Sequence, residues 1–184
     1  MRLTFPTFLT FVRLALTPLL VIALARHEFT GAVVVLAVAL LSDLLDGHLA
    51  RRWQQESLLG ASLDPLADKI LIISCYITLI LSPSTRLTLP LWFLAVVLTK
   101  ELVLLAGAAY FGLIKKQLAV KPLLMGKLSM VAQSFLVTWL VACALFQWQP
   151  QRTLNSFIAI ALALVIASLA QYALYVFRKQ RSSL

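Results

Sequence analysis

Charge is scarce in this sequence, and negative charge most of all. Only 12% of its 184 residues are charged, and Asp and Glu together number seven, against 16 Lys and Arg. Cysteine is also rare: Cys75 and Cys143 lie inside apolar stretches and lack the spacing of a zinc site or a disulfide framework. The two cysteines are therefore predicted to be packing residues, and the shortage of charge excludes an ordinary soluble domain.

Apolar residues take the place of the missing charge and make up 61% of the chain. A membrane-spanning helix needs about 20 predominantly apolar residues, and stretches of that kind fill the sequence. We therefore predict an all-α, polytopic membrane protein with six transmembrane helices and one domain over residues 1–184. The predicted spans are residues 7–26, 31–51, 62–82, 89–112, 123–147 and 153–177.

Basic residues are distributed unevenly between the predicted loops. Turn-forming residues place loops at 27–31, 82–84, 115–122 and 147–151, and such short loops make neighbouring helices antiparallel. Ten Lys and Arg then fall on the side of Arg51, and three on the opposite side. The positive-inside rule therefore predicts that both termini and the four aspartates face the cytoplasm. The expected location is the cell's inner membrane. The net charge of +9 is expected to attract anionic lipid headgroups and not nucleic acid.

Four of the seven acidic residues fall in one short stretch, as two pairs of aspartates. Asp43 and Asp46 are three residues apart, and Asp64 and Asp68 are four apart, so on helices each pair shares one face. Two facing pairs would gather carboxylate oxygens, which hard divalent cations such as Mg²⁺ prefer and often bridge to substrate phosphates. The alternative is a group of solvated acids at a helix end, although acids near a membrane seldom serve packing alone.

The spacing of these aspartates and their neighbours forms a recognisable signature. It is Asp-x2-Asp-Gly-x2-Ala-Arg-x8-Gly-x3-Asp-x3-Asp, running from Asp43 to Asp68, and it resembles the signature of the CDP-alcohol phosphatidyltransferase family. That resemblance implies CDP-diacylglycerol as donor, release of CMP, and two Mg²⁺ or Mn²⁺ ions held by all four aspartates. It also implies that Asp68 is the base that takes the acceptor's proton. The residues implied to bind the CDP group are Asp43, Gly47, Ala50, Arg51 and Gly60.

The residues of the signature have physical reasons to bind a nucleotide. Gly47 and Ala50 remove side-chain bulk where a nucleotide approaches the backbone. Arg51 can hold a phosphate with two charge-assisted hydrogen bonds. The stretch from Pro6 to Pro18 is similar to the start of the bacterial phosphatidylglycerophosphate synthases within the family, which implies glycerol 3-phosphate as the acceptor.

Three basic residues outside the signature are candidates for binding the acceptor. Lys127 and Arg13 come first, because both have a family-like context near predicted cytoplasmic helix ends; for Arg13 the alternative is an arginine that snorkels to the interface. Lys100 comes third, since the same synthases have arginine there and lysine cannot reproduce a bidentate grip. Because adjacent helical residues diverge, Lys100 and Glu101 are expected to have separate partners, with a purely structural ion pair as the alternative.

Other functions remain open from sequence alone. Within the family, phosphatidylglycerol could be the acceptor, as in cardiolipin synthases. A membrane prenyltransferase also uses aspartates and Mg²⁺ but has more spans and a different aspartate spacing. A cation transporter would explain intramembrane acids but not Gly47, Ala50 and Arg51 at these positions, and would place its acids near the midplane. The expected partners are CDP-diacylglycerol, a glycerol-3-phosphate-like acceptor and the bilayer, and a homodimer is left open.

Overall fold

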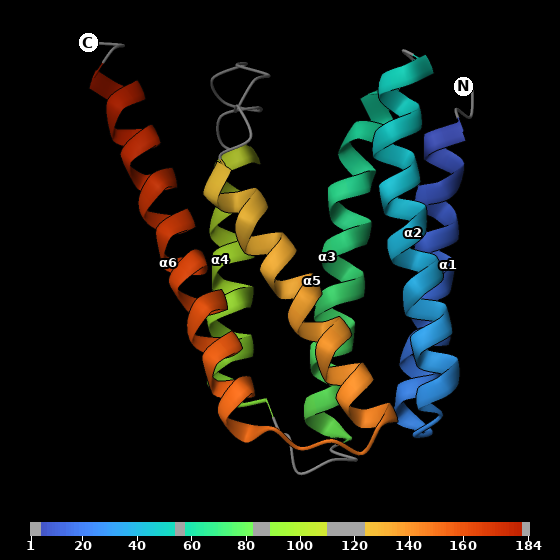
Figure 1. Cartoon of the computed structure of the whole chain (residues 1–184). Helices are drawn as coiled ribbons and strands as arrows, with labels where there is room; N and C mark the ends of the chain where they lie inside the picture. The colour runs from blue at the N-terminus through green and yellow to red at the C-terminus, as the bar shows by residue number, and fades with distance from the viewer. Residues whose placement is uncertain (1–4, 54–57, 83–88, 110–123, 182–184) are drawn as a thin grey trace. The chain divides into compact units, whose positions relative to one another are not determined.

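The computed structural model describes residues 5–53, 58–82, 89–109 and 124–181 (Figure 1). Side chains are described for residues 10–42, 66–82, 89–107 and 124–176. The described parts of the chain form six helices and contain no strand, which confirms the all-α prediction. The helices are α1 (Phe5–Ala25), α2 (Phe29–Trp53), α3 (Leu58–Leu81), α4 (Leu91–Ala109), α5 (Leu124–Leu145) and α6 (Gln151–Arg181).

The turn between α1 and α2 is shorter than the sequence predicts. The backbone N–H of Glu28 donates to the carbonyl of Ala23 at 2.9 Å, and that of His27 to Leu24 at 3.1 Å. This is the Schellman arrangement, with His27 in the left-handed conformation at φ 60°. The turn is complete by Glu28, so α2 begins at Phe29 and Gly31 lies inside the helix and not in a loop.

The end of α5 repeats the same arrangement. The N–H of Trp148 donates to the carbonyl of Cys143 at 2.9 Å, that of Gln147 donates to Ala144 at 3.4 Å, and Gln147 has φ 54°. Neither turn uses glycine, the residue that usually occupies this position. For that reason the sequence alone does not mark these two helix ends sharply.

The chain divides into two units. The first contains α1, α2, α3 and the part of α5 from Val137 onward; the second contains α4, the part of α5 up to Leu136, and α6. Buried polar residues occur in both units.

In the first unit, α1 packs against both α2 and α3. The buried face of α1 changes character along the helix, from polar near its start to apolar near its end. Spacings of three and four residues keep these side chains on one face. In order they are Thr10, Arg13, Thr17, Leu20 and Leu24.

In the second unit, α4 packs against α6 through an unusually close approach. A Cβ atom added at Gly107 would overlap the phenol ring and oxygen of Tyr172, which is buried in α6. Near the start of α5, the Gln171 side chain accepts a hydrogen bond from the Met125 N–H at 3.2 Å. First-turn N–H groups have no partner within their own helix, so Gln171 of α6 provides one for the start of α5.

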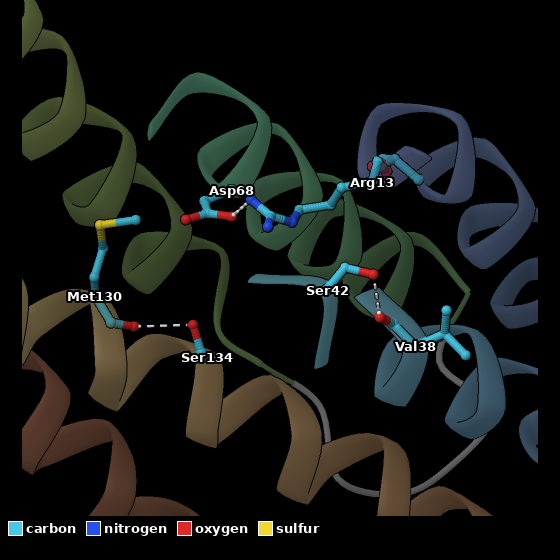
Figure 2. A network of polar contacts seen from close by, with 7 residues as sticks. Arg13, Val38, Ser42, Asp68, Met130 and Ser134 are labelled. Atoms are coloured by element: carbon cyan, nitrogen blue, oxygen red, sulfur yellow. Dashed lines mark hydrogen bonds and ion pairs between the residues drawn. The ribbon is translucent and has the colours of Figure 1, made fainter. Parts of the chain in front are cut away.

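Hydroxyl side chains in the helices satisfy their hydrogen bonds locally. Ser42 donates to the Val38 carbonyl at 2.8 Å in the first unit, and Ser134 donates to the Met130 carbonyl at 3.1 Å in the second (Figure 2). Thr78 donates to the Ser74 carbonyl at 2.8 Å in the same way. Such bonds to the preceding turn let apolar helices carry hydroxyls without exposing an unsatisfied group.

Two of the described helices are long and apolar enough to cross a membrane, over Leu124–Leu145 and Gln151–Val176. Shorter apolar helical stretches occur over Thr10–Ala25 and Phe29–Ser42. The six predicted helices are therefore present as elements. Six membrane crossings, cytoplasmic termini and one domain over the whole chain stay predictions.

Candidate functional site

The residues of the predicted signature lie on two helices of the first unit. On α2 the backbone positions are those of Asp43, Asp46, Gly47, Ala50 and Arg51, and on α3 those of Gly60, Asp64 and Asp68. Only the side chain of Asp68 belongs to the described set. The roles predicted for the other seven residues therefore stay predictions.

Asp68 forms an ion pair with Arg13. The guanidinium Nη1 of Arg13, on α1, donates to the Asp68 Oδ1, on α3, at 2.6 Å. Figure 2 shows the Arg13 side chain extended toward the carboxylate. Arg13 is only 1% exposed, while the Asp68 side chain is 20% exposed. A cation this deeply buried needs a partner of opposite charge, because an uncompensated buried charge is costly.

This pair answers one question that the sequence left open about Arg13. An arginine that snorkels would place its guanidinium at the interface, whereas Arg13 is buried and bonded to the predicted base. Burial and the pair with Asp68 favour an inward-facing guanidinium over the snorkelling alternative. A direct role of Arg13 at an acceptor phosphate is not tested by the pair and stays a prediction.

The fit of a divalent cation is judged from the chemistry of the donors. Among the side chains that the structure describes, no three His, Cys, Asp or Glu gather in a group that could hold a metal ion. Three of the four predicted ligands lie outside that set, so Asp68 alone speaks to the question. Its carboxylate is a hard oxygen donor that binds a positive group, and Arg13 is a stand-in for a cation there. The Asp68 carboxylate therefore fits a divalent cation, and the other three ligands stay predictions.

A second group of buried polar side chains lies in the second unit, on α4 and α5. The Lys100 Nζ is 2.6 Å from the Glu101 Oε1 and donates to the Ser129 Oγ at 3.2 Å. The Gln133 Nε2 donates to the same Ser129 Oγ at 3.1 Å. Lys100 and Ser129 are at most 1% exposed. We call these four residues the Lys100 cluster.

The Lys100 cluster corrects the expectation that Lys100 and Glu101 have separate partners. Adjacent positions on a helix diverge, but both side chains are long and flexible enough to curl toward each other, and Lys carries its charge at the end of a four-carbon stem. The alternative of an ion pair between them is confirmed. The acceptor role of Lys100 itself is not tested.

Lys127 lies near the start of α5 and is exposed. Ser129, on the same helix, accepts hydrogen bonds from Lys100 and from Gln133. Sequence reasoning missed this link. The available signal was the four-residue spacing of Ser129 and Gln133 in an apolar helix, opposite a lysine that needs buried partners.

Similarity to known proteins covers nearly all of the chain. A family model described as CDP-alcohol phosphatidyltransferase matches residues 3–171. The chain belongs to the CDP-alcohol phosphatidyltransferase family. The match includes Arg13, all four aspartates and the Lys100 cluster, so both groups of polar residues fall within the region that defines the family.

Relatives within the family carry two different names. Cardiolipin synthase (CMP-forming) of Streptomyces coelicolor is 45% identical over 109 residues, which is 56% of this chain and 49% of that protein. The Homo sapiens cardiolipin synthase is 32% identical over 161 residues, 79% of this chain and 52% of that protein. The CDP-diacylglycerol--glycerol-3-phosphate 3-phosphatidyltransferase of Shigella flexneri is 30% identical over 178 residues, 95% of this chain and 92% of that protein. The chain thus spans about half the length of these cardiolipin synthases.

Proposed function

We propose that this chain transfers the phosphatidyl group of CDP-diacylglycerol to a hydroxyl of glycerol 3-phosphate and releases CMP. The observation that carries the proposal is the match to the Shigella flexneri 3-phosphatidyltransferase, which covers 95% of this chain and 92% of that protein. A match over almost the full length of both chains includes regions outside the signature, where acceptor-binding residues are expected.

The chemistry is a substitution at phosphorus. The acceptor's hydroxyl oxygen forms a bond to the phosphorus that carries diacylglycerol, the bond from that phosphorus to the CMP oxygen breaks, and CMP leaves with the electron pair. Asp68 takes the proton of the hydroxyl. In the structure, Arg13 lies 2.6 Å from the Asp68 carboxylate and balances its charge.

The residues proposed to hold two Mg²⁺ or Mn²⁺ ions are Asp43, Asp46, Asp64 and Asp68. When bound, such cations neutralise charge on the diphosphate as the phosphorus–oxygen bond breaks. Asp43, Gly47, Ala50, Arg51 and Gly60 are proposed to bind the cytidine and its phosphate. This assignment rests on the spacing of the signature and on the positions of its residues in α2 and α3.

The acceptor's phosphate carries about two negative charges and needs donors of its own. Lys127 and Arg13 are the first candidates, with Lys100 third. Lys127 is exposed and does not belong to the Lys100 cluster, so its ammonium is accessible to a phosphate. Lys100 is a weaker candidate, because Glu101 at 2.6 Å already balances its charge.

Transfer to phosphatidylglycerol, which would give cardiolipin, is the second candidate function. The 45% identity to the Streptomyces coelicolor cardiolipin synthase favours it. The balanced charge of the Lys100 cluster also suits an acceptor less charged than glycerol 3-phosphate.

One assay separates these functions. The purified protein is incubated with CDP-diacylglycerol and Mg²⁺, and CMP is measured without acceptor, with glycerol 3-phosphate, and with phosphatidylglycerol. We expect CMP release that depends on glycerol 3-phosphate. CMP release only with phosphatidylglycerol would support the second function instead. If neither acceptor caused CMP release, both functions would be contradicted.

We also propose that the chain lies in the inner membrane of the cell and crosses it six times. The aspartates and both termini would then face the cytoplasm. His27 lies in the exposed turn after α1, and Leu124 is the exposed first residue of α5. A cysteine at Leu124 should react with a membrane-impermeant thiol reagent only from the cytoplasmic side, and one at His27 only from the other. Cys75 and Cys143 are buried and should give little background. Reversed labelling would contradict both the topology and the location of the site.

A further inference from the structure

Two residues with separate proposed roles are bonded to each other in the structure. Asp68 is proposed as metal ligand and base, and Arg13 as a donor to the acceptor's phosphate, yet Arg13 Nη1 lies 2.6 Å from Asp68 Oδ1. A divalent cation bound to the same carboxylate would repel the guanidinium and compete with it for the lone pairs of Oδ1, so metal binding should weaken the pair.

The burial of the two side chains bears on this competition between Arg13 and a metal ion for Asp68. Arg13 is 1% exposed and points from the polar part of α1 toward α3. A carboxylate without a cation and a guanidinium without an anion would each be costly at such a site. The carboxylate is the more open partner, at 20% exposed, so an incoming cation can approach Asp68 while Arg13 remains enclosed.

We propose that Arg13 is a positioning residue that serves as the counter-ion of Asp68 when the metal site is empty and turns to the acceptor's phosphate when cations bind. A planar guanidinium suits both tasks, since it can grip either a carboxylate or a phosphate through two N–H groups. The inference rests on the proposed function. It adds that metal ions and the acceptor's phosphate bind cooperatively, because the metal releases the residue that the phosphate requires.

The competing role for Arg13 is that of a fixed brace, a residue that only orients the Asp68 carboxylate. The two roles predict opposite changes in metal affinity when Arg13 is removed. A residue that merely orients a metal ligand strengthens metal binding, and its loss typically weakens metal affinity by about 10–100-fold. A counter-ion competes with the metal, so its loss should strengthen metal affinity. The sign of the change in affinity therefore separates the two roles, independently of catalytic activity.

The first experiment uses the unaltered protein. Free Mn²⁺ is measured by electron paramagnetic resonance during titration of the detergent-solubilised protein, alone, with glycerol 3-phosphate, and with glycerol as the uncharged control. We expect glycerol 3-phosphate to tighten Mn²⁺ binding by about tenfold, within the roughly 5–150-fold range of coupling between linked sites. Glycerol should leave Mn²⁺ affinity unchanged. Equal affinity with and without glycerol 3-phosphate, in a preparation that uses it to release CMP, would overturn the inference.

The second experiment compares Arg13→Gln with Thr17→Val. Thr17 lies one turn further along the same buried face of α1 and donates to the Arg13 carbonyl at 3.0 Å, so its variant perturbs the helix without removing the charge. We expect Arg13→Gln to bind Mn²⁺ about tenfold more tightly than the unaltered protein, and to lose the effect of glycerol 3-phosphate. Thr17→Val should match the unaltered protein. Weaker binding by Arg13→Gln would assign the brace role and overturn the inference.

Two further controls keep the test decisive. If Arg13→Gln does not fold, Arg13→Lys takes its place, and its weaker pair with Asp68 should change Mn²⁺ affinity in the same direction by a smaller factor. Failure of the proposed function appears differently: no CMP release with glycerol 3-phosphate, and no coupling by that acceptor, while the increase in Mn²⁺ affinity on loss of Arg13 would still be present.

Discussion

The two units of the molecule each bury a basic residue, but they balance its charge in different ways. In the first unit, Arg13 pairs with an aspartate 55 residues away and joins α1 to α3. In the second, Lys100 pairs with its neighbour Glu101 on α4 and donates a hydrogen bond to Ser129 on α5. Both cations are 1% exposed. The difference shows that equal burial of a charge can serve different purposes.

The Arg13–Asp68 pair joins two helices, whereas the Lys100–Glu101 pair lies within one helix. Separating Arg13 from Asp68 leaves charges on two helices, each of which can then bind a ligand of opposite charge. Lys100 and Glu101 move together, so their charges cancel wherever α4 lies. We therefore expect variants of the first pair to change chemistry and ligand binding, and variants of the second to change mainly stability.

The largest expected effect comes from removing the base in the first unit. Asp68→Asn should lower turnover by about 10²–10⁴-fold, because an amide cannot accept the acceptor's proton. The variant should remain folded and still bind CDP-diacylglycerol. CMP release measures turnover, and Glu101→Gln in the second unit is the control, expected to lose far less. Near-normal CMP release by Asp68→Asn would remove Asp68 from the role of base.

The stability of two variants tests whether Lys100 and Glu101 mainly balance each other's charge. Lys100→Met alone leaves Glu101 buried without its cation and should cost about 3–5 kcal/mol, the usual loss when one partner of a buried pair is removed. The double change Lys100→Met with Glu101→Leu removes both charges and should recover most of that loss. Unfolding in detergent with a denaturant measures both. A double variant as unstable as the single one would show that the Lys100 cluster depends on more than this pair.

Much of the fold follows from the sequence. Apolar stretches of about 20 residues predict helices in water-poor surroundings, and all six are found within a few residues of their predicted positions. The ends are less well predicted. Gly31 was expected in a loop, but His27 ends α1 in a left-handed turn without glycine. At the other end of the chain, α6 continues to Arg181 because residues 178–181 are good helix formers and nothing interrupts them.

The candidate site was predicted less completely. Spacing predicted a site at the aspartates, but the bond between Arg13 and Asp68 depends on how α1 packs against α3. No local pattern contains that information. The pairing of Lys100 with Glu101 was only the alternative prediction, because adjacent helical residues diverge in their Cβ directions; long side chains can overcome that divergence.

The helix contacts of the two units can be compared through two glycines. Gly107 lies where the Tyr172 ring meets α4, while nothing lies within 4 Å of a Cβ added at Gly31 in α2. Gly107→Ala should therefore destabilise the protein by about 1–3 kcal/mol through overpacking. Gly31→Ala should be neutral or stabilise by up to about 1 kcal/mol, since alanine favours helix.

Thermal unfolding of both glycine variants gives the comparison directly. The combination of Gly107→Ala with Tyr172→Leu should be more stable than Gly107→Ala alone, because the smaller side chain removes the overlap. If Gly107→Ala were as stable as Gly31→Ala, the close approach of α4 and α6 would not be a packing constraint.

The smallest expected effect concerns the acceptor and compares an exposed cation with the buried ones. Lys127 is exposed near the start of α5, so it can contact a phosphate without first leaving a buried ion pair, as Arg13 must. Lys127→Ala should raise the apparent KM for glycerol 3-phosphate by about tenfold or less, with little change in that for CDP-diacylglycerol, because it removes a ground-state phosphate contact. Arg152, an exposed cation at the start of α6, is the matched control, and Arg152→Ala should change neither KM. Equal increases in both KM values would mean that Lys127 acts only through the general field of basic residues. The acceptor's phosphate would then be bound elsewhere, and Arg13 would be the remaining first candidate.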